Sequence, residues 1–156
     1  MRIVVGGDHA GFHLKAYLVP LLRERGHDVL DIGAHGPTEV DFPDVAAALC
    51  ARVQSGDYQR GLLVCGTGVG AAIAANKMPG IRAAVCHDIF SAHQSVEHDD
   101  VNVMCIGGWI VGERLALELV ERFLQATFDT ASSSFVRRSS SFVVRHLFFV
   151  LCVWLL

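Results

Sequence analysis

The chain has 156 residues, of which 52% are hydrophobic and 19% are charged, and its net charge is −3. This length predicts one domain with a substantial core, and this composition excludes a disordered chain. The small negative charge gives no reason to expect nucleic acid as a partner. The sequence contains no run of about eighteen apolar residues, so it predicts no membrane-spanning helix.

The sequence alternates between strand and helix patterns five times. We expect strands at 2–6, 28–32, 62–64, 83–86 and 103–106, and helices that end at Gly26, run from Asp44 to about Gln54, begin near Gly70, and cover 89–97 and 112–124. The alternation predicts an α/β fold of three layers, a doubly wound Rossmann-like sheet of about five parallel strands with helices on both faces. In such a sheet the ligand site lies beyond the carboxyl ends of the strands.

Two features of the first half concern the helices alone. Pro20 falls inside the first helix pattern, where we expect it to kink the helix. Asp41 and Asp44 flank Pro43, and we interpret both acids as structural caps of the second helix.

The third strand leads into a turn with a glycine at every second position. In GLLVCGTGVGAAIAANK (61–77), Cys65 ends the strand and Gly66, Gly68 and Gly70 follow. Glycine lets a ligand approach the backbone closely, and a helix starting near Gly70 would direct free N–H groups at an anion. The same field is expected to lower the pKa of the Cys65 thiol. A reactive thiol and an anion site are therefore predicted in one turn.

The glycine turn by itself leaves other interpretations open. Taken alone, Cys65 is more typical of an inert buried residue. The spacing Gly66-x-Gly68-x-x-Ala71 also fits a dinucleotide-binding turn, with Asp88 as the acid that binds the ribose. It does not fit a P-loop, because no Lys-Ser/Thr pair follows, and Ala71 stands where a cysteine phosphatase loop has an arginine.

Other titratable residues fall at the predicted carboxyl ends of the strands. The full set is Asp8, His9, Cys65–Gly70, His87, Asp88 and Gly107–Trp109. A polar set at these positions is typical of a catalytic crevice.

The cysteines and the C-terminal segment bear on location and domain boundaries. The five cysteines are odd in number, and no signal peptide precedes the first strand, which favours free thiols in the cytoplasm. After Asp129 the chain has no acid, and two serine triplets flank Arg137 and Arg138 before an apolar end. We expect a domain at 1–128 and an atypical tail at 129–156, which either contacts a partner subunit or has no folded role.

Four segments match a known pattern in order: GGDHAGFHLK (6–15), VDFPD (40–44), CGTGVGAAIAANKMPGIRAA (65–84) and EHDDVNVMCIGG (97–108). Together they resemble the ribose-5-phosphate isomerase B family, within the wider group that includes galactose-6-phosphate isomerase. The likeness implies an intramolecular oxidoreductase of the pentose phosphate pathway that interconverts ribose 5-phosphate and ribulose 5-phosphate through a cis-enediol. It implies no metal and no cofactor, and a homodimer, with further pairing to a tetramer left open, whose active site is shared between chains. Neither nucleic acid nor a membrane is expected as a partner.

The resemblance assigns roles to residues of this chain. Cys65 would move the proton between C1 and C2 of the sugar, since Ala71 stands where some family members carry a glutamate base. Thr67 would help to hold the enediolate oxygen, and His98, from the partner chain, would open the sugar ring. The substrate-binding residues implied are Asp8, His9, Gly66, Gly68, Val69, Gly70, Asp99, Arg137 and Arg138. Asp8 would bind sugar hydroxyls and His9 the phosphate.

The sequence departs from the family pattern at the substrate-binding positions. Asp99 replaces a usual asparagine, Trp109 replaces a usual phosphate-binding arginine, and only Arg137 and Arg138 stand near the spacing of the C-terminal phosphate arginines. Three alternatives therefore stay open: an isomerase of another sugar phosphate, such as allose or galactose 6-phosphate; an inactive member; and a non-catalytic dinucleotide- or phosphate-binding domain. Against the last, dinucleotide folds carry the glycine turn after the first strand.

Overall fold

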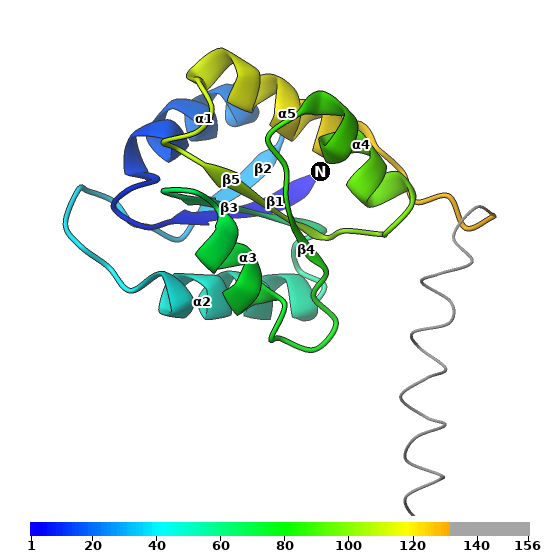
Figure 1. Cartoon of the computed structure of the whole chain (residues 1–156), viewed down its shortest axis with the longest axis horizontal. Helices are drawn as coiled ribbons and strands as arrows, with labels where there is room; N and C mark the ends of the chain where they lie inside the picture. The colour runs from blue at the N-terminus through cyan, green and yellow to red at the C-terminus, as the bar shows by residue number, and fades with distance from the viewer. Residues whose placement is uncertain (132–156) are drawn as a thin grey trace, which may run out of the picture.

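The computed structural model describes residues 1–131, in which five strands alternate with five helices (Figure 1). The elements are β1 Arg2–Gly7, α1 Phe12–Glu24, β2 Asp28–Asp31, α2 Phe42–Gln54, β3 Arg60–Cys65, α3 Val69–Ala75, β4 Ala83–Val85, α4 Ile89–Glu97, β5 Val103–Gly107 and α5 Glu113–Gln125. The predicted fold class is confirmed. Almost all of the predicted tail, with Arg137 and Arg138, lies outside the described residues. None of the helices in the described range is long and apolar enough to cross a membrane.

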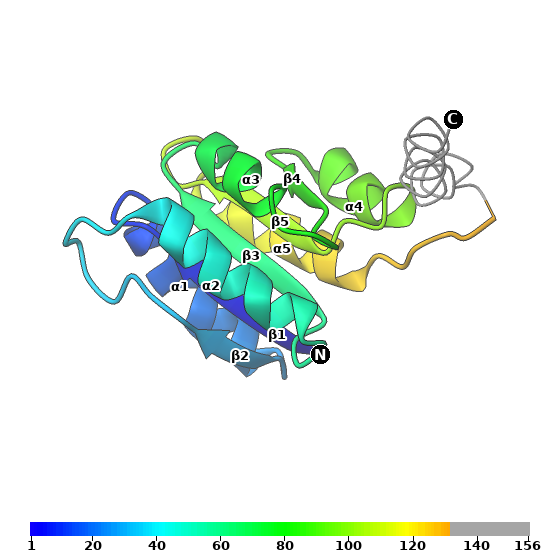
Figure 2. The same cartoon turned by 90° about the horizontal axis from the view of Figure 1, so that it is seen from below.

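The strands form one parallel sheet in the order β2-β1-β3-β5-β4. Helices α1, α4 and α5 cover one face and α2 and α3 cover the other (Figures 1 and 2). This division follows from right-handed crossovers, which place the helix on opposite faces when the chain moves in opposite directions along the sheet. The chain therefore leaves β3 toward one face, while it leaves both neighbours, β1 and β5, toward the other. Such divergence opens a crevice at the carboxyl end of β3.

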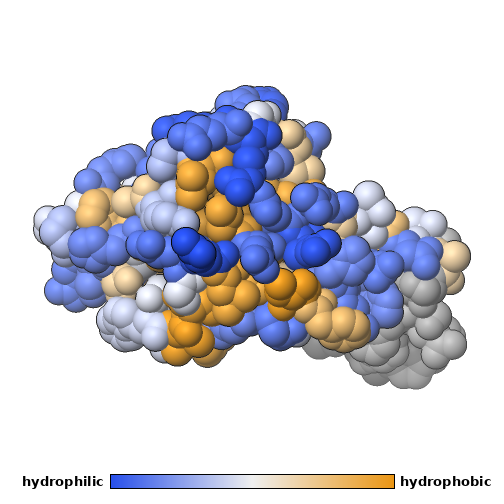
Figure 3. Space-filling view, turned by 90° about the horizontal axis from the view of Figure 1, so that it is seen from above, coloured by the Kyte–Doolittle hydropathy of each residue, from blue (hydrophilic) through white to orange (hydrophobic). Residues whose placement is uncertain are grey.

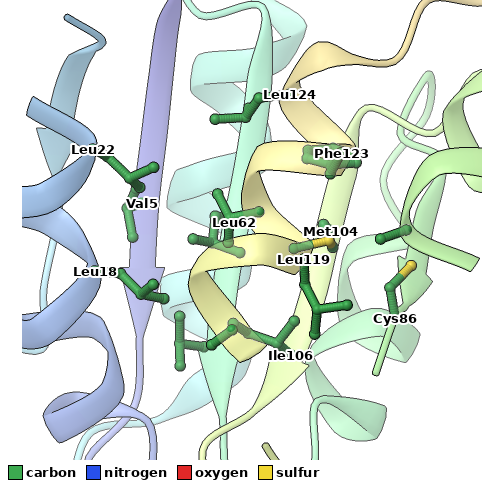
Figure 4. Packing of buried hydrophobic residues seen from close by; sticks show 14 of the residues in the cluster. Val5, Leu18, Leu22, Leu62, Cys86, Met104, Ile106, Leu119, Phe123 and Leu124 are labelled. Atoms are coloured by element: carbon green, nitrogen blue, oxygen red, sulfur yellow. The ribbon is translucent and has the colours of Figure 1, made fainter. Parts of the chain in front are cut away.

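Hydrophobic layers on both faces hold the helices to the sheet. Figure 4 shows the layer in which Leu18 of α1 and Leu119 of α5 pack over the strands. Successive strand residues face opposite layers, so Leu62 belongs to this layer and Leu63 to the layer beneath α2 and α3. Burial on both faces explains why the strands are nearly continuous apolar runs.

The surface of the described chain also carries large hydrophobic side chains that are more than half exposed. They are Val69, Ile73, Phe90, Trp109 and Ile110. They belong to α3, the start of α4 and the loop between β5 and α5. Figure 3 shows a band of hydrophobic residues across the face that carries α1, α4 and α5, flanked by hydrophilic surface.

Two details of the helices differ from expectation or extend it. The second helix begins at Phe42, two residues earlier than predicted, and Asp41 at its N-cap position makes no side-chain capping hydrogen bond. The prediction that Asp41 is a cap is therefore wrong; its side chain lines a cavity described below. The first helix runs from Phe12 to Glu24 with Pro20 inside it.

A buried ion pair joins α1 to the end of β2. Lys15 is 1% exposed, and its Nζ lies 2.5 and 2.6 Å from the two carboxylate oxygens of Asp31. Asp31 also accepts the N–H of Gly33 at 3.0 Å, and Gly33 and Ala34 exchange backbone hydrogen bonds with Gly7 at 2.7 and 2.6 Å. The cation therefore fixes the loop after β2 against the end of β1.

Replacing Lys15 with methionine is expected to lower the free energy of unfolding by about 3 kcal/mol, because the Asp31 carboxylate would lose its cation in a largely buried place. Urea unfolding followed by circular dichroism measures this change. The double variant Lys15→Met/Asp31→Asn removes the carboxylate charge as well and should recover most of the loss. A single variant within about 1 kcal/mol of the parent would contradict a stabilising role for the pair.

Candidate active site

The crevice centres on Cys65, the last residue of β3. Its register partner on β5 is Gly107, while Val64 pairs with Gly7 on the other side. The N–H of Asp8 donates to the Val64 carbonyl at 3.2 Å, and the N–H of Gly108 donates to the Cys65 carbonyl at 2.7 Å. The loops after β1 and β5 are thereby held on the two sides of the cysteine.

Asp8 faces the thiol of Cys65. The aspartate is 5% exposed and accepts the N–H of Gly11 at 2.9 Å, and its carboxylate acts on the Cys65 thiol so as to raise the pKa of the thiol. The turn that carries Asp8 approaches β3 so closely that a Cβ on Gly11 would lie 2.0 Å from the Val64 carbonyl oxygen. Only glycine fits there, and this contact places the carboxylate beside the sulfur.

The glycine turn surrounds the sulfur from the other side. Backbone N–H groups of Gly66 and Gly68 act on the Cys65 thiol so as to lower its pKa, and Gly68 adopts a φ of +79°, which favours glycine. Thr67 is exposed, and its Oγ1 accepts the N–H of Val69 at 3.4 Å. The predicted grouping of Cys65 with Asp8 and this turn is therefore present in the structure.

The pKa of the Cys65 thiol is raised, which contradicts the expectation that the turn lowers it. Burial is the largest cause, followed by the hydrogen bond that Asp8 accepts from the thiol. The N–H groups of Gly68 and Gly66 act in the predicted direction but are outweighed. The sequence indicated the N–H groups, but not that a carboxylate would lie against the sulfur.

A cavity of about 540 Å³ opens beside Asp8. Its lining comes from the β1–α1 turn and from the loop that enters α2, and comprises Asp8, His9, Glu39, Val40, Asp41 and Phe42. Carboxylates are acceptors only, so this wall suits a ligand rich in hydroxyl donors. Glu39 and Val40 were missed from the sequence, although both lie in or directly before the VDFPD segment.

Aromatic side chains pack against two glycines of the turn. The Trp109 indole covers Gly66, where an added Cβ would lie 2.8 Å from the ring, and the Phe42 ring covers Gly70 at 3.1 Å by the same measure. Trp109 is nevertheless 72% exposed. Its indole forms an apolar wall next to the turn, at the position where an arginine was expected from the resemblance.

The structure does not bring His98 and Asp99 to this crevice within one chain. Helix α4 starts beyond the carboxyl end of β4 and runs back to the amino end of β5, so His98 lies at the opposite edge of the sheet. The His98 side chain is 47% exposed, and its Nδ1 lies 3.3 Å from Nε2 of Gln94.

Two other candidates have local structural partners. Nε2 of His87 accepts the N–H of Gly107 at 3.0 Å, which ties the end of β4 to β5. Asp88 caps α4 by accepting the N–H of Ser91 at 2.7 Å, so its carboxylate is not free to serve as the acid of a dinucleotide site. Within residues 1–131, no three His, Cys, Asp or Glu side chains are grouped as metal ligands.

Comparisons with known proteins agree on one family. The family model described as Ribose/Galactose Isomerase matches residues 3–140. Ribose-5-phosphate isomerase B of Escherichia coli (strain K12) is 43% identical over 128 residues, 82% of this chain and 86% of that protein. D-erythrulose-4-phosphate isomerase 2 of Mycolicibacterium smegmatis is 43% identical over 137 residues, 86% of this chain and 90% of that protein. The solved ribose-5-phosphate isomerase B of Clostridium thermocellum has a TM-score of 0.88 and 41% identity, and the match covers 94% of this chain and 99% of that one.

Iodoacetamide is expected to modify Cys65 before Cys50, Cys86 and Cys105, which are all buried. Only the thiolate reacts, and a raised pKa makes it the minor form, so the rate should increase about tenfold per pH unit until the pKa is reached. Asp8→Asn removes the carboxylate that raises the pKa, and the rate profile should move to lower pH. Peptide mass spectrometry of samples quenched at several pH values gives the rate, with Cys65→Ser as the control. A profile that is unchanged or moves to higher pH in Asp8→Asn would contradict this assignment.

Proposed function

Because the chain belongs to the Ribose/Galactose Isomerase family, we propose that it is an aldose–ketose isomerase that interconverts ribose 5-phosphate and ribulose 5-phosphate. The observation that carries this proposal is the Cys65 thiol, held at the crevice between the Asp8 carboxylate and the N–H groups of Gly66 and Gly68. A base next to fixed N–H donors is what proton transfer beside a carbonyl requires.

The reaction moves one proton between adjacent carbons. The Cys65 thiolate takes the proton from C2 of the open-chain aldose, and the C2–H electron pair forms the C1=C2 bond of an enediolate. Backbone N–H groups of the turn and the Thr67 hydroxyl stabilise the negative oxygen at C1. The thiol then returns the proton to C1, while the hydroxyl at C2 passes its proton to the negative oxygen at C1. O1 becomes a hydroxyl and C2 becomes the ketose carbonyl.

Asp8 explains how a thiol with a raised pKa becomes a base when the substrate binds. In the free crevice the carboxylate accepts the thiol proton in a hydrogen bond, which stabilises the neutral thiol. A sugar hydroxyl that donates to Asp8 replaces the thiol as donor, and the enediolate-binding N–H groups then favour the thiolate. His9, exposed at the cavity, would contact the phosphate end of the sugar.

A second copy of the chain supplies His98 for ring opening. Within one chain His98 and Cys65 lie at opposite edges of the sheet, so a two-fold dimer with neighbouring chains in opposite orientation would bring them together. The five exposed hydrophobic side chains named above are of the kind that interfaces cover, and several stand at the edge that carries Cys65. We place this homodimer in the cytoplasm, where Cys50, Cys65, Cys86 and Cys105 stay free.

A four-carbon sugar phosphate is the second candidate substrate. The Mycolicibacterium smegmatis relative is as identical to this chain as the Escherichia coli relative, at 43%. The same proton transfer serves both substrates, because C1 and C2 are equivalent in the two sugars. Turnover of ribose 5-phosphate and of erythrose 4-phosphate, compared as kcat/KM, separates them.

Cys65→Ser is expected to lower solvent deuterium exchange at C2 of the sugar far more than tenfold, because a serine hydroxyl is a much weaker base than a thiol. Nuclear magnetic resonance in D₂O measures the exchange, and the thermal shift with ribose 5-phosphate shows that binding persists. Cys86 is a buried cysteine outside the Cys65 crevice, so Cys86→Ser is the matched control and should keep the parental rate of deuterium exchange. Exchange within tenfold of the parent, about 1.4 kcal/mol in the barrier, would remove Cys65 from the role of base.

Mixing two inactive variants tests whether the site is shared. Cys65→Ser and His98→Ala chains that exchange subunits form hybrid dimers, each with one complete site and one site that lacks both groups. Random exchange makes half of the dimers hybrids, so about one quarter of the parental ribose 5-phosphate activity should return. Activity is measured before and after exchange, with Cys65→Ser mixed with itself as the control. No recovery despite exchange, verified by mass spectrometry, would mean that His98 does not act across chains.

A further inference from the structure

The turn between α4 and β5 has a conformation that its own residues do not favour. Asp100 has a φ of +51°, and it is the one residue other than glycine in the described chain with a positive φ. Its N–H donates to the Val96 carbonyl at 3.1 Å, which is the arrangement in which a helix usually ends at a glycine. An aspartate is less favourable there than a glycine, so a contact from outside the turn would stabilise it.

Arg82 makes that contact, and it grips Asp100 at two points. Its Nη2 lies 2.6 Å from the Asp100 carboxylate, and its Nε donates to the Asp100 carbonyl at 2.6 Å. The main-chain N–H of Arg82 donates to Oδ1 of Asn102 at 2.9 Å, and its carbonyl accepts the N–H of Asn102 at 3.0 Å. The planar guanidinium can make both contacts at once, whereas a lysine could make only one.

The contacts between Arg82 and Asp100 hold the turn that directly follows His98. His98 is the C-cap residue of α4, two residues before Asp100, and its N–H donates to the Gln94 carbonyl at 2.9 Å. The His98 side chain is 47% exposed, and its contacts are with Gln94 and Glu97 of its own helix, so the position of the imidazole follows the helix end that Arg82 and Asp100 hold.

We propose that Arg82 and Asp100 are positioning residues for ring opening: they set the turn that presents His98 to the crevice of a second copy. This inference rests on the proposed function and deepens it. In this proposal Arg82 acts through the geometry of His98 and not by contact with the substrate. Its loss should therefore harm the same step as the loss of His98 and leave the proton transfer at Cys65 intact.

The test compares a sugar that closes a ring with one that cannot. Ribose 5-phosphate is mostly a furanose. In erythrose 4-phosphate the phosphate is esterified to O4, so this sugar has no free hydroxyl that could close a five-membered ring. Arg82→Met is expected to lower kcat/KM for ribose 5-phosphate at least tenfold more than for erythrose 4-phosphate. Asp100→Asn tolerates the positive φ but loses the charge. It should also lower kcat/KM more for ribose 5-phosphate than for erythrose 4-phosphate, but by a smaller factor than Arg82→Met.

The double variant Arg82→Met/His98→Ala distinguishes positioning from general damage. If Arg82 acts through His98, the double variant should lose no more ribose 5-phosphate activity than His98→Ala alone. Arg2→Met, which breaks the exposed pair with Asp28 at the same edge of the sheet, is the matched control and should lose neither activity.

Equal losses on both sugars for Arg82→Met and Asp100→Asn, or additive losses in the double variant, would overturn the inference while the proposed function stands. An unmodified protein that turns over neither sugar would overturn the proposed function and this inference with it.

Discussion

The close contact between the β1–α1 turn and the end of β3 is the constraint on which the site depends. A Cβ on Gly7 or Gly11 would lie 2.5 or 2.0 Å from the same Val64 carbonyl oxygen. Because these two glycines have no Cβ, the turn can approach the end of β3 closely and place Asp8 beside Cys65. Right-handed crossovers then send the chain away from this point in opposite directions, which leaves space for a ligand above the contact.

That arrangement gives the free protein a protected thiol at Cys65. A thiol that is partly buried and hydrogen bonded to a carboxylate stays protonated, and a thiol reacts with oxidants and electrophiles far more slowly than a thiolate. In the proposed mechanism, the same groups would favour the thiolate once a sugar hydroxyl donates to Asp8 and negative charge develops near the N–H groups. Under that proposal, the thiolate would form only when substrate is present to give it a proton.

The sequence predicted the order of elements because parallel strands buried on both faces leave strong apolar runs. Strand and helix positions agreed with the structure within about two residues, and α4 agreed at both ends. Four features were not predictable from local pattern. Lys15 was not expected in the core, because its partner Asp31 lies in another element. Asp41 was predicted to be a helix cap, and the pKa of the Cys65 thiol was predicted to be lowered, whereas it is raised. Both outcomes depend on which distant loops meet. The placement of His98 at the far edge followed from the direction of α4, which the spacing alone did not reveal.

The indole that covers Gly66 gives the molecule an optical property of its own. Trp109 is the one tryptophan within the described residues, and the second tryptophan of the chain is Trp154 in the tail. An indole that is 72% exposed and packed on the turn next to the reactive cysteine emits according to the water around it. In a chain with Trp154 replaced, the wavelength of the Trp109 fluorescence would therefore report whether the neighbouring turn is hydrated, occupied by a sugar or covered by another subunit. No attached dye is needed.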